Sequence, residues 1–383
     1  MLQILAVENY RSIQRLELSL GRLTVVTGGN GSGKSSLYRT LRLLADTAQR
    51  GVVAGIAREG GLESCFWAGS HDQSALGSGG SPARMRLGFA GEDFSYAMTL
   101  GMPSPSPGES NRFRETFFAQ DPEIKHEIIW AGPVYRPASV LVERKGPSVR
   151  IRTDSGWRSL TQELAPFYSL FDTGGAVDSP EIGAVRELIR DWRFYDHFRT
   201  DAASPARQPQ LGTRTPVLSA SGSDLAAALQ TIREIGDPQA LDLAIDDAFP
   251  GSRMEVIREG GLFTLSLHQT GLFRPLTASE FSDGTLRYLL LVAALLTPRP
   301  PGLMVLNEPE NSLHPDLLPA LARLIINACT RSQVWIVSHS ELLVRALREA
   351  KELVSFELEK SDGRTQIKGK GGLLDGPLWR WPA

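Results

Sequence analysis

Short apolar runs separated by turns open the chain. Three of them predict β-strands, because they alternate with polar residues or are rich in β-branched ones: residues 2–7, 14–20 and 22–27. After a glycine-rich segment the apolar period becomes helical at Lys34, and leucines fall on one face of a helix predicted to run to about residue 49. The start of the chain therefore predicts strand, loop and helix in that order.

In the middle of the chain, apolar and polar residues alternate in runs typical of antiparallel strands: residues 84–90, 93–100, 126–131, 139–143 and 148–153. We call this region, about residues 84–160, the β lobe. Two segments rich in glycine, serine or proline, residues 51–82 and 101–110, predict surface loops because such residues favour turns over regular elements.

Helical periodicity returns further along the chain, and two strands around the turn Glu259-Gly-Gly261 follow it. These elements fall at residues 181–192, 223–235, 238–248, 253–258 and 262–268, and they predict a helical or mixed lobe over about 180–270. The pattern then becomes helix, strand, helix and strand, at residues 284–296, 303–307, 315–328 and 333–337. Wholly apolar strands joined through helices predict parallel strands with crossover connections.

Composition narrows the class of protein. The chain has 383 residues, with 41 Lys and Arg against 43 Asp and Glu, so its formal charge of −2 excludes a uniformly basic surface but leaves a local basic patch open. Only Cys65 and Cys329 occur, which excludes a disulfide framework and favours a reducing compartment. The longest apolar run, Tyr288 to Leu296, is about half of a membrane-spanning helix. We therefore expect a cytoplasmic protein without membrane contacts.

The glycine-rich segment carries the most specific chemistry. Gly28-Gly-Asn-Gly-Ser-Gly33-Lys34-Ser35 has the spacing of a phosphate-binding loop and lies between a predicted strand and a predicted helix, which a flexible Gly/Ser turn would not require. Its backbone amides and helix start suit phosphate oxygens, and the Lys34 ammonium can reach the β and γ phosphates. Ser35 is the natural Mg²⁺ ligand. The predicted nucleotide-binding residues are Asn30, Gly31, Ser32, Gly33, Lys34, Ser35 and Ser36, with Arg11 from the N-terminal segment.

A second candidate lies where the apolar strand 303–307 ends, in Asn307-Glu308-Pro309-Glu310. Parallel sheets place their ligands at this edge, and the segment resembles a Walker B strand. Glu308 is the candidate for orienting or deprotonating the attacking water. Asn307 stands where the general pattern has Asp, so its amide oxygen would bind Mg²⁺ or its waters without a charge. Read by itself, the segment could also be a plain strand exit.

Two further segments become candidates for the same site when they are considered together with the phosphate-binding loop and the strand end at Asn307. Ser282-Asp283-Gly284 opens the helix at 284–296; alone it predicts a helix N-cap, yet it also resembles the signature loop that contacts the γ phosphate held by an opposite subunit. His339 follows the strand 333–337 and could hydrogen-bond the γ phosphate or the attacking water. A neighbouring backbone or carboxylate group would then set the tautomer of its imidazole. His314 is expected to start a helix and, secondarily, to face a subunit interface. Near the N-terminus, Tyr10 or Arg11 could touch nucleotide or simply pack.

Together these motifs resemble the RecF and SMC head group of the ABC-type ATPases, in the order 9–12, 28–35, 282–284, 307–310 and 337–339. The resemblance implies an α/β P-loop NTPase with a mixed central sheet, an antiparallel β lobe and an α-helical lobe. It implies one head over 1–383, built from 1–50 and 275–383, with the β lobe and the 180–270 lobe inserted. It also implies ATP and Mg²⁺ as cofactors, catalysis by Lys34, Glu308 and His339, and a head-to-tail homodimer. Gln120 and Gln162 are candidates for the family's Q-loop glutamine.

The sequence is compatible with two kinds of partner, DNA or another protein. One hypothesis is an ATPase of DNA repair, recombination or chromosome maintenance, and the other is a regulatory ATPase switch, for example in phage defence, that controls a separate nuclease or toxin. Candidate DNA contacts are Arg136, Arg144, Lys145, Arg150, Arg152, the aromatic and basic run Trp192 to Arg199, Arg207 and Arg214. The competing interpretation makes these aromatics core residues and these arginines ordinary surface.

Overall fold

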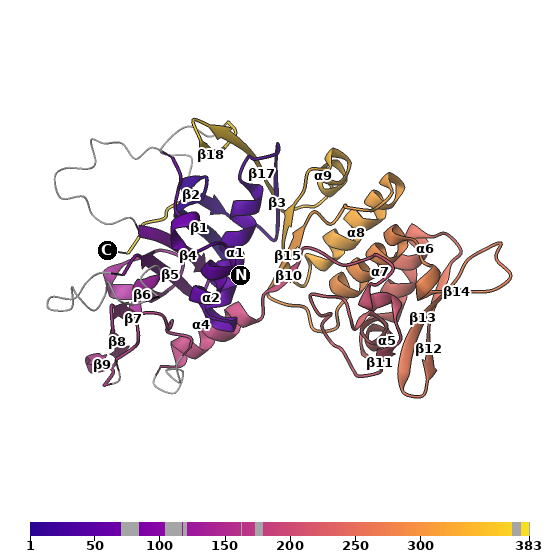
Figure 1. Cartoon of the computed structure of the whole chain (residues 1–383), viewed down its shortest axis with the longest axis horizontal. Coiled ribbons are helices and arrows are strands. Elements are labelled where there is room, and N and C mark those ends of the chain that lie inside the picture. The colour runs from indigo at the N-terminus through magenta and orange to yellow at the C-terminus, as the bar shows by residue number, and fades with distance from the viewer. Residues whose placement is uncertain are drawn as a thin grey trace. The chain divides into compact units, whose positions relative to one another are not determined.

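The computed structural model describes residues 1–69, 84–103, 117, 121–161, 163–172, 179–369 and 377–382. The chain forms two compact units (Figure 1). Unit 1 contains residues 1–20, 27–192 and 356–383, and unit 2 contains residues 21–26 and 193–355. The strands β3 (Leu23–Gly28) and β17 (Leu353–Ser361) both begin in unit 2 and end in unit 1. The Q-loop candidates Gln120 and Gln162 lie outside the described residues.

Unit 1 is built on an eight-stranded antiparallel sheet in the order β2-β1-β4-β5-β6-β7-β8-β9. Its strands are β1 (Leu2–Tyr10), β2 (Ile13–Ser19), β4 (Arg84–Gly91), β5 (Phe94–Gly101), β6 (Glu123–Ala131), β7 (Val140–Lys145), β8 (Ser148–Thr153) and β9 (Gly156–Ser159). The antiparallel prediction for the β lobe is confirmed. The two N-terminal strands extend the same sheet, which local patterning could not reveal.

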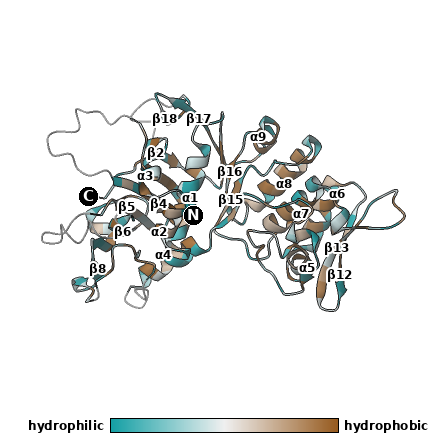
Figure 2. Cartoon of the chain, in the orientation of Figure 1, coloured by the Kyte–Doolittle hydropathy of each residue, from teal (hydrophilic) through white to brown (hydrophobic). Residues whose placement is uncertain are grey.

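Both faces of this sheet are covered, which explains why β1, β4 and β5 are so apolar. Helices α1 (Lys34–Gln49) and α4 (Pro180–Arg190) pack against each other and against β4 and β5. Elsewhere the sheet buries a cluster in which Trp379, from the end of the chain, joins Trp130. Figure 2 shows the hydropathy of these elements. The hairpin of β17 and β18 (Arg364–Ile367) also belongs to unit 1 from Phe356 onward.

One loop prediction is wrong in part. Residues 51–69 contain helices α2 (Val52–Arg58) and α3 (Leu62–Cys65), because Val52, Ile56 and Leu62 are buried and anchor these short turns. The glycines that suggested a loop stand before each helix, where Gly51 and Gly61 adopt positive φ angles of 82° and 88°. The remainder of that segment, 70–82, and residues 104–110 lie outside the described residues.

Unit 2 contains parallel strands in the order β10-β15-β16-β3. β10 spans Arg193–Tyr195, β15 spans Leu303–Asn307 and β16 spans Gln333–Val337. Helix α8 (Leu318–Ala328), preceded by a 3₁₀ turn at Pro315–Leu317, connects β15 to β16. The predicted parallel strands with a crossover are therefore confirmed. Asn307 is paired with Val337, and Val337 with Val26, so the ends of β15 and β16 lie level with each other, and β3 ends two residues further on, at Gly28.

Helices and a small antiparallel sheet complete unit 2. They are α5 (Leu225–Ile235), α6 (Pro238–Ala248), α7 (Asp283–Leu295), α9 (Glu341–Leu347), β11 (Gln210–Leu211), β12 (Arg253–Glu259), β13 (Leu262–His268) and β14 (Leu276–Thr277). Short 3₁₀ turns occur in unit 2 at Pro205–Arg207 and Ala278–Glu280, and in unit 1 at Pro137–Ser139. Every residue of α7 from Leu286 to Leu295 is buried, which matches the long apolar run read from the sequence. In the part of the chain that is described, no helix is long and apolar enough to cross a membrane.

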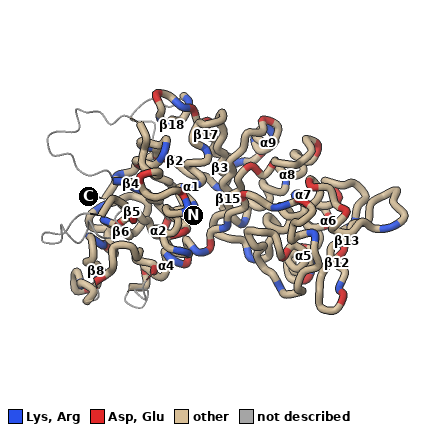
Figure 3. The backbone as a smooth tube through the Cα atoms, in the orientation of Figure 1, with Lys and Arg blue, Asp and Glu red and all other residues tan. Residues whose placement is uncertain are grey.

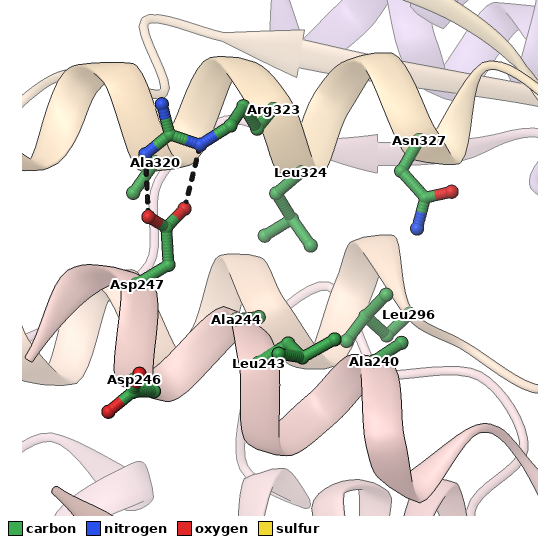
Figure 4. Close-up of a pocket in the computed structure, with 10 residues that line it drawn as sticks. All are labelled: Ala240, Leu243, Ala244, Asp246, Asp247, Leu296, Ala320, Arg323, Leu324 and Asn327. Atoms are coloured by element: carbon green, nitrogen blue, oxygen red, sulfur yellow. Dashed lines mark hydrogen bonds and ion pairs between the residues drawn. The ribbon is translucent and has the colours of Figure 1, made fainter. Parts of the chain in front are cut away.

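A pocket of about 400 Å³ lies between α6 and α8 (Figure 4). Its floor is mostly aliphatic, and at one end Arg323 donates two hydrogen bonds to Asp247, at 2.9 Å from Nε and 2.6 Å from Nη2. None of the predicted nucleotide, signature or metal residues lines it.

The structure argues against several of the candidate DNA contacts. Trp192, Phe194, Tyr195 and Phe198 are buried, so their rings cannot stack on bases. Arg207 is buried and bonds to Asp283 and to backbone carbonyls around residue 280. Basic and acidic residues are interspersed along the backbone of both units (Figure 3). Arg136, Arg152 and Arg214 are the exposed arginines that remain from this set beside the partly paired Arg150 and Arg199.

Arg144 is the clearest case of a predicted surface cation that belongs to the core. Its guanidinium is fully buried and donates to Glu127 Oε2 at 2.8 Å, to Ala165 O at 3.0 Å and to the carbonyl of Tyr168. Glu127 is equally buried and also accepts from the Tyr96 hydroxyl at 2.6 Å. The pair therefore ties β6 and β7 to the segment 165–170 inside unit 1.

Arg144→Ala should destabilise the protein by about 3–5 kcal/mol, because it leaves the Glu127 carboxylate buried without its partner. Arg15→Ala is the matched control, since Arg15 pairs with Glu17 at 2.8 Å on the surface, where such pairs contribute about 0–1 kcal/mol. Urea unfolding of both variants measures the difference. Equal unfolding free energies for the two would contradict a structural role for Arg144.

Candidate functional site

The glycine-rich loop of residues 28–35 links β3 to α1, as predicted, and has the backbone of an anion-binding loop. Gly28, Gly31 and Gly33 adopt positive φ angles of 144°, 76° and 106°. Gly33 is the N-cap of α1 and provides no side-chain hydrogen bond, so no capping side chain occupies the amides of the first turn. A helix start of this kind favours negative charge through its amides and its dipole.

Two of these glycines are also required by close packing within unit 1. A Cβ at Gly28 would lie 2.3 Å from the Leu358 carbonyl oxygen, and one at Gly33 would lie 2.1 Å from the Thr365 hydroxyl. Thr365 is held in turn by Ser12, whose carbonyl accepts from its amide at 2.8 Å and whose hydroxyl lies 2.7 Å from its own. The β17–β18 hairpin therefore fixes the path of the loop, and only glycine fits at both places.

Lys34 places its ammonium inside the loop. Nζ donates to the carbonyl oxygens of Gly28 at 2.6 Å and Gly29 at 3.0 Å, and the residue is 8% exposed. A cation held at this point is available to phosphate oxygens at the cost of two hydrogen bonds to carbonyls. Asn30 and Ser35 are exposed and Ser36 is half-buried. Within the described part of the chain, the buried Ser32 hydroxyl has no hydrogen-bond partner.

Arg11 is engaged by a carboxylate that sequence reasoning did not identify. Its Nε and Nη2 donate to Glu59 Oε2 at 3.1 and 2.8 Å, and the Tyr10 hydroxyl donates to the same oxygen at 2.6 Å. Tyr10 is fully buried, so the packing interpretation of this tyrosine holds. Burial, helped by Glu59, raises the pKa of the Cys65 thiol to about 11. Glu59 lies between α2 and α3, in the segment predicted as a loop, which is why no signal marked it.

In unit 2, Asn307 ends β15 and Glu308 follows it in an unusual conformation. The Glu308 backbone has a φ of 48°, a left-handed value that costs a residue with a side chain about 1–3 kcal/mol. Three hydrogen bonds hold it there: its amide donates to Val337 O at 2.8 Å, and its carbonyl accepts from Asn311 N and Arg287 Nη2, each at 3.1 Å. Strain maintained by this many contacts at a strand end marks Glu308 as a candidate functional residue.

The Glu308 carboxylate faces two polar neighbours. Asn311 Nδ2 donates to Oε2 at 2.8 Å, and His339 Nδ1 lies 3.7 Å from Oε1. Glu308 and His339 remain 37% and 53% exposed at their side chains, so both can be reached from solvent. Within unit 2 the structure thus brings together Asn307, Glu308 and His339 at the shared edge of β15 and β16.

Glu310 is a buried residue of this edge that the sequence reasoning quoted only as part of the motif. Its Oε1 accepts from Ser338 Oγ at 2.6 Å, His339 N at 2.9 Å and Ser340 N at 3.2 Å. The signal that could have found it is a second acidic residue so close behind a strand end that its carboxylate can reach the neighbouring strand end.

The signature segment behaves as a helix cap in this structure. Ser282 is the N-cap of α7 and accepts from Thr285 N at 3.1 Å, while Asp283 Oδ1 pairs with Arg207 at 2.8 Å. Gly284 permits a close approach, because a Cβ there would lie 2.9 Å from the carbonyl oxygen of Ser312. A cavity of about 510 Å³ beside it is lined from α7, from Asn311 and Ser312, and from residues 197–201. His314 caps the 3₁₀ turn that follows, as expected of a helix-start residue.

The two groups of residues are connected through β3. Val26 lies in unit 2 beside Val337, and its carbonyl accepts from Ser338 N at 3.1 Å. Gly28 follows Val26 by two residues, a chain length of about 7 Å at most. The strand that leads into the phosphate loop therefore pairs with β16, and β16 pairs with β15, which ends at Asn307.

The donor set suits Mg²⁺ shared with a phosphate group rather than a metal held by protein alone. The Ser35 hydroxyl in unit 1 and the Asn307 amide oxygen in unit 2 are each hard oxygen ligands of the kind that Mg²⁺ prefers. Among the described residues, no group of three or more His, Cys, Asp or Glu side chains could hold a metal ion. Mg²⁺ generally keeps one or two protein ligands and takes the rest from phosphates and water, and this supply of donors fits that pattern.

A solved structure shows the same fold. An SMC head bound to the C-terminal winged-helix domain of ScpA matches with a TM-score of 0.52 at 12% identity, covering 96% of this chain and 97% of that one. An SMC head with an extended coiled coil, bound to the C-terminal domain of ScpA derived from Pyrococcus furiosus, gives 0.48 at 12% identity, with 96% and 95% covered. The fold assignment rests on the first of these. No curated protein sequence matches the chain.

The sequence also matches a family model over residues 23–128 and 153–345, well over half of its length. That model is described as "AAA domain, putative AbiEii toxin, Type IV TA system". The P-loop NTPase fold class and the resemblance to ABC-type ATPase heads are thereby confirmed. The matched segments contain the phosphate loop, Asn307, Glu308, Ser282 and His339. The chain belongs to this family of AAA-domain proteins, which are ATPases of the P-loop type.

Proposed function

We propose that the protein binds ATP with Mg²⁺ and hydrolyses it to ADP and phosphate. The observation that carries the proposal is the loop of residues 28–35, whose left-handed glycines, uncapped helix start and internal Lys34 ammonium together suit a triphosphate. Asn30 to Ser36 would surround the phosphates, with Lys34 exchanging its two carbonyl partners for β and γ oxygens. Arg11 would reach the nucleotide only by giving up part of its contact with Glu59.

The residues of unit 2 supply the groups that hydrolysis needs. Glu308 would orient and deprotonate the attacking water, and His339 would contact that water or the γ phosphate. Ser35 and Asn307 would hold Mg²⁺, and the bound ion would neutralise charge on the phosphate oxygens. Because Asn307 contributes no charge, we expect a weaker hold on the metal than an aspartate would give.

We further propose that two copies assemble head to tail around ATP, with Ser282, Asp283 and Gly284 of one copy facing the γ phosphate held by the other. The start of α7 suits this role because its amides carry the positive end of a long buried helix. Ser282 and Asp283 are exposed, so a second copy of the chain could contact them.

Lys34→Ala should weaken ATP binding by about 10- to 100-fold, because it removes charge-assisted hydrogen bonds worth about 1.5–3 kcal/mol. Lys368→Ala is the control, since Lys368 is an exposed lysine of unit 1 paired with Glu357 at 2.6 Å. Titration calorimetry with ATP and Mg²⁺ measures both. Wild-type affinity in Lys34→Ala would remove the phosphate-loop assignment.

Glu308→Gln should bind ATP normally, hydrolyse it at least about 100-fold more slowly and accumulate as a dimer, because the base is lost while the phosphate contacts remain. Size-exclusion chromatography with and without ATP and Mg²⁺ measures the dimer. Glu357→Gln, on the surface of unit 1, is the control that should hydrolyse ATP like wild type. A Glu308→Gln protein that binds ATP yet stays monomeric would count against the head-to-tail arrangement.

For the biological role we propose a regulatory ATPase that acts on a protein partner such as a toxin or nuclease. The family description, which names a putative toxin of a toxin–antitoxin system, favours this role. The burial of Arg144, Arg207 and the aromatic residues of 192–198 weakens the alternative of direct DNA binding in repair or chromosome maintenance.

Fluorescence anisotropy with labelled duplex DNA decides between these roles. We expect no saturable binding at micromolar protein with ATP and Mg²⁺, at either low or physiological salt, because basic and acidic residues are interspersed along both units and Arg150 and Arg199 are paired with carboxylates. Saturable binding that weakens steeply with salt, and that Arg136→Ala or Arg152→Ala reduces, would instead support the DNA role.

A further inference from the structure

The carboxylate of Glu310 is built into the loop that carries His339. It accepts hydrogen bonds from the side chain of Ser338 and from the backbone amides of His339 and Ser340, all at Oε1. The Glu310 side chain is 6% exposed, and its buried Oε2 has no hydrogen-bond partner among the residues that the structure describes. The three donors converge on one oxygen and fix the position of the carboxylate against the backbone amides of His339 and Ser340.

The imidazole of His339 presents one particular nitrogen to this carboxylate. Nδ1 lies 3.5 Å from Glu310 Oε1 and 3.7 Å from Glu308 Oε1. Ionised carboxylates only accept hydrogen bonds, and a neutral imidazole has one nitrogen that donates and one that accepts. A proton on Nδ1 therefore faces negative oxygens, whereas a lone pair on Nδ1 would be repelled by them.

Glu310 is better placed than Glu308 to determine which ring nitrogen of His339 carries the proton. Glu308 is 37% exposed and shares its carboxylate with Asn311, so solvent weakens its field. Glu310 is buried, lies closer to Nδ1 and is bonded to the histidine's own amide. The field of a buried, immobile charge acts on the imidazole with little screening.

We propose that Glu310 is a positioning residue that keeps neutral His339 protonated at Nδ1, so that Nε2 is an acceptor. The consequence for chemistry rests on the proposed ATPase function. An Nε2 lone pair can accept a hydrogen bond from the attacking water, but it cannot donate to a γ-phosphate oxygen, which is itself an acceptor. In this proposal, neutral His339 orients the attacking water, and Glu308 accepts the proton of that water.

The test has one readout that needs no hydrolysis. Protein labelled with ¹⁵N-histidine is studied by long-range ¹H–¹⁵N NMR at a pH of about 8, where an ordinary imidazole is neutral. The His339 signals are assigned by their loss in His339→Gln, and the nitrogen shifts report which ring nitrogen carries the proton. The wild-type protein should show the Nδ1–H form. A wild-type Nε2–H form would overturn the proposal whatever the variants do.

Two variants identify the carboxylate responsible. Glu310→Gln keeps an amide oxygen for the loop's three donors but removes the charge, and it should shift His339 substantially toward the Nε2–H form. Glu308→Gln should leave the Nδ1–H form in place. Ser338→Ala, which removes one donor and keeps the carboxylate, is the control for general disturbance of the loop and should also keep it. An unchanged tautomer in a folded Glu310→Gln protein would contradict the proposal.

Kinetics supply the second readout. Glu310→Gln should lower kcat for ATP about 10-fold with an unchanged KM, as expected when a group that orients another catalytic side chain is lost. In a His339→Gln background the same substitution should change kcat no further, because Glu310 acts through the histidine. Additive losses in the double variant would contradict this. A wild-type protein without ATPase activity would refute the proposed function while leaving the NMR result to decide the tautomer.

Discussion

The parallel pairing of β15, β16 and β3 is the constraint on which the candidate site depends. Asn307 is in register with Val337, and Val337 with Val26, so β15 and β16 end at one level and β3 continues two residues further, to Gly28. The residues that follow them are Glu308, Ser338 and, two residues beyond Val26, Gly28. Segments more than 270 residues apart in sequence therefore begin their loops from a common edge. The strand register determines which residues lie near one another, because parallel strands place the loops that bind ligands at their carboxyl ends.

The loops at this edge share a physical feature, which is backbone held in conformations that most residues avoid. In the phosphate loop, glycine removes the steric cost, and close packing against Leu358 and Thr365 makes glycine necessary. At Glu308 a side chain is needed, so the left-handed backbone is retained and hydrogen bonds from Asn311 and Arg287 offset its strain. Both solutions fix functional groups before any ligand arrives, which is what electrostatic catalysis requires.

Sequence reasoning succeeded where local pattern decides the structure. The helix at Lys34, the strand 303–307 and the crossover through α8 follow from periodicity and from glycine and proline positions. It failed where distant contacts decide. The helices at 52–65 depend on burial of Val52 and Leu62, and the burial of Arg144 depends on Glu127 from another strand. Glu310 was missed as a functional residue for the same reason, since its role depends on the loop after β16.

The central claim is that one copy's phosphate loop is completed by another copy's signature segment, and mixing two inactive variants tests it most directly. Lys34→Ala removes the ammonium that would contact the phosphates, and Ser282→Arg places a large side chain at the start of α7. In a head-to-tail dimer of one variant with the other, one site combines an intact Lys34 with an intact Ser282. The account predicts that the equimolar mixture regains ATPase activity that neither variant has alone. A mixture as inactive as its components, despite heterodimers detected by native mass spectrometry, would contradict it.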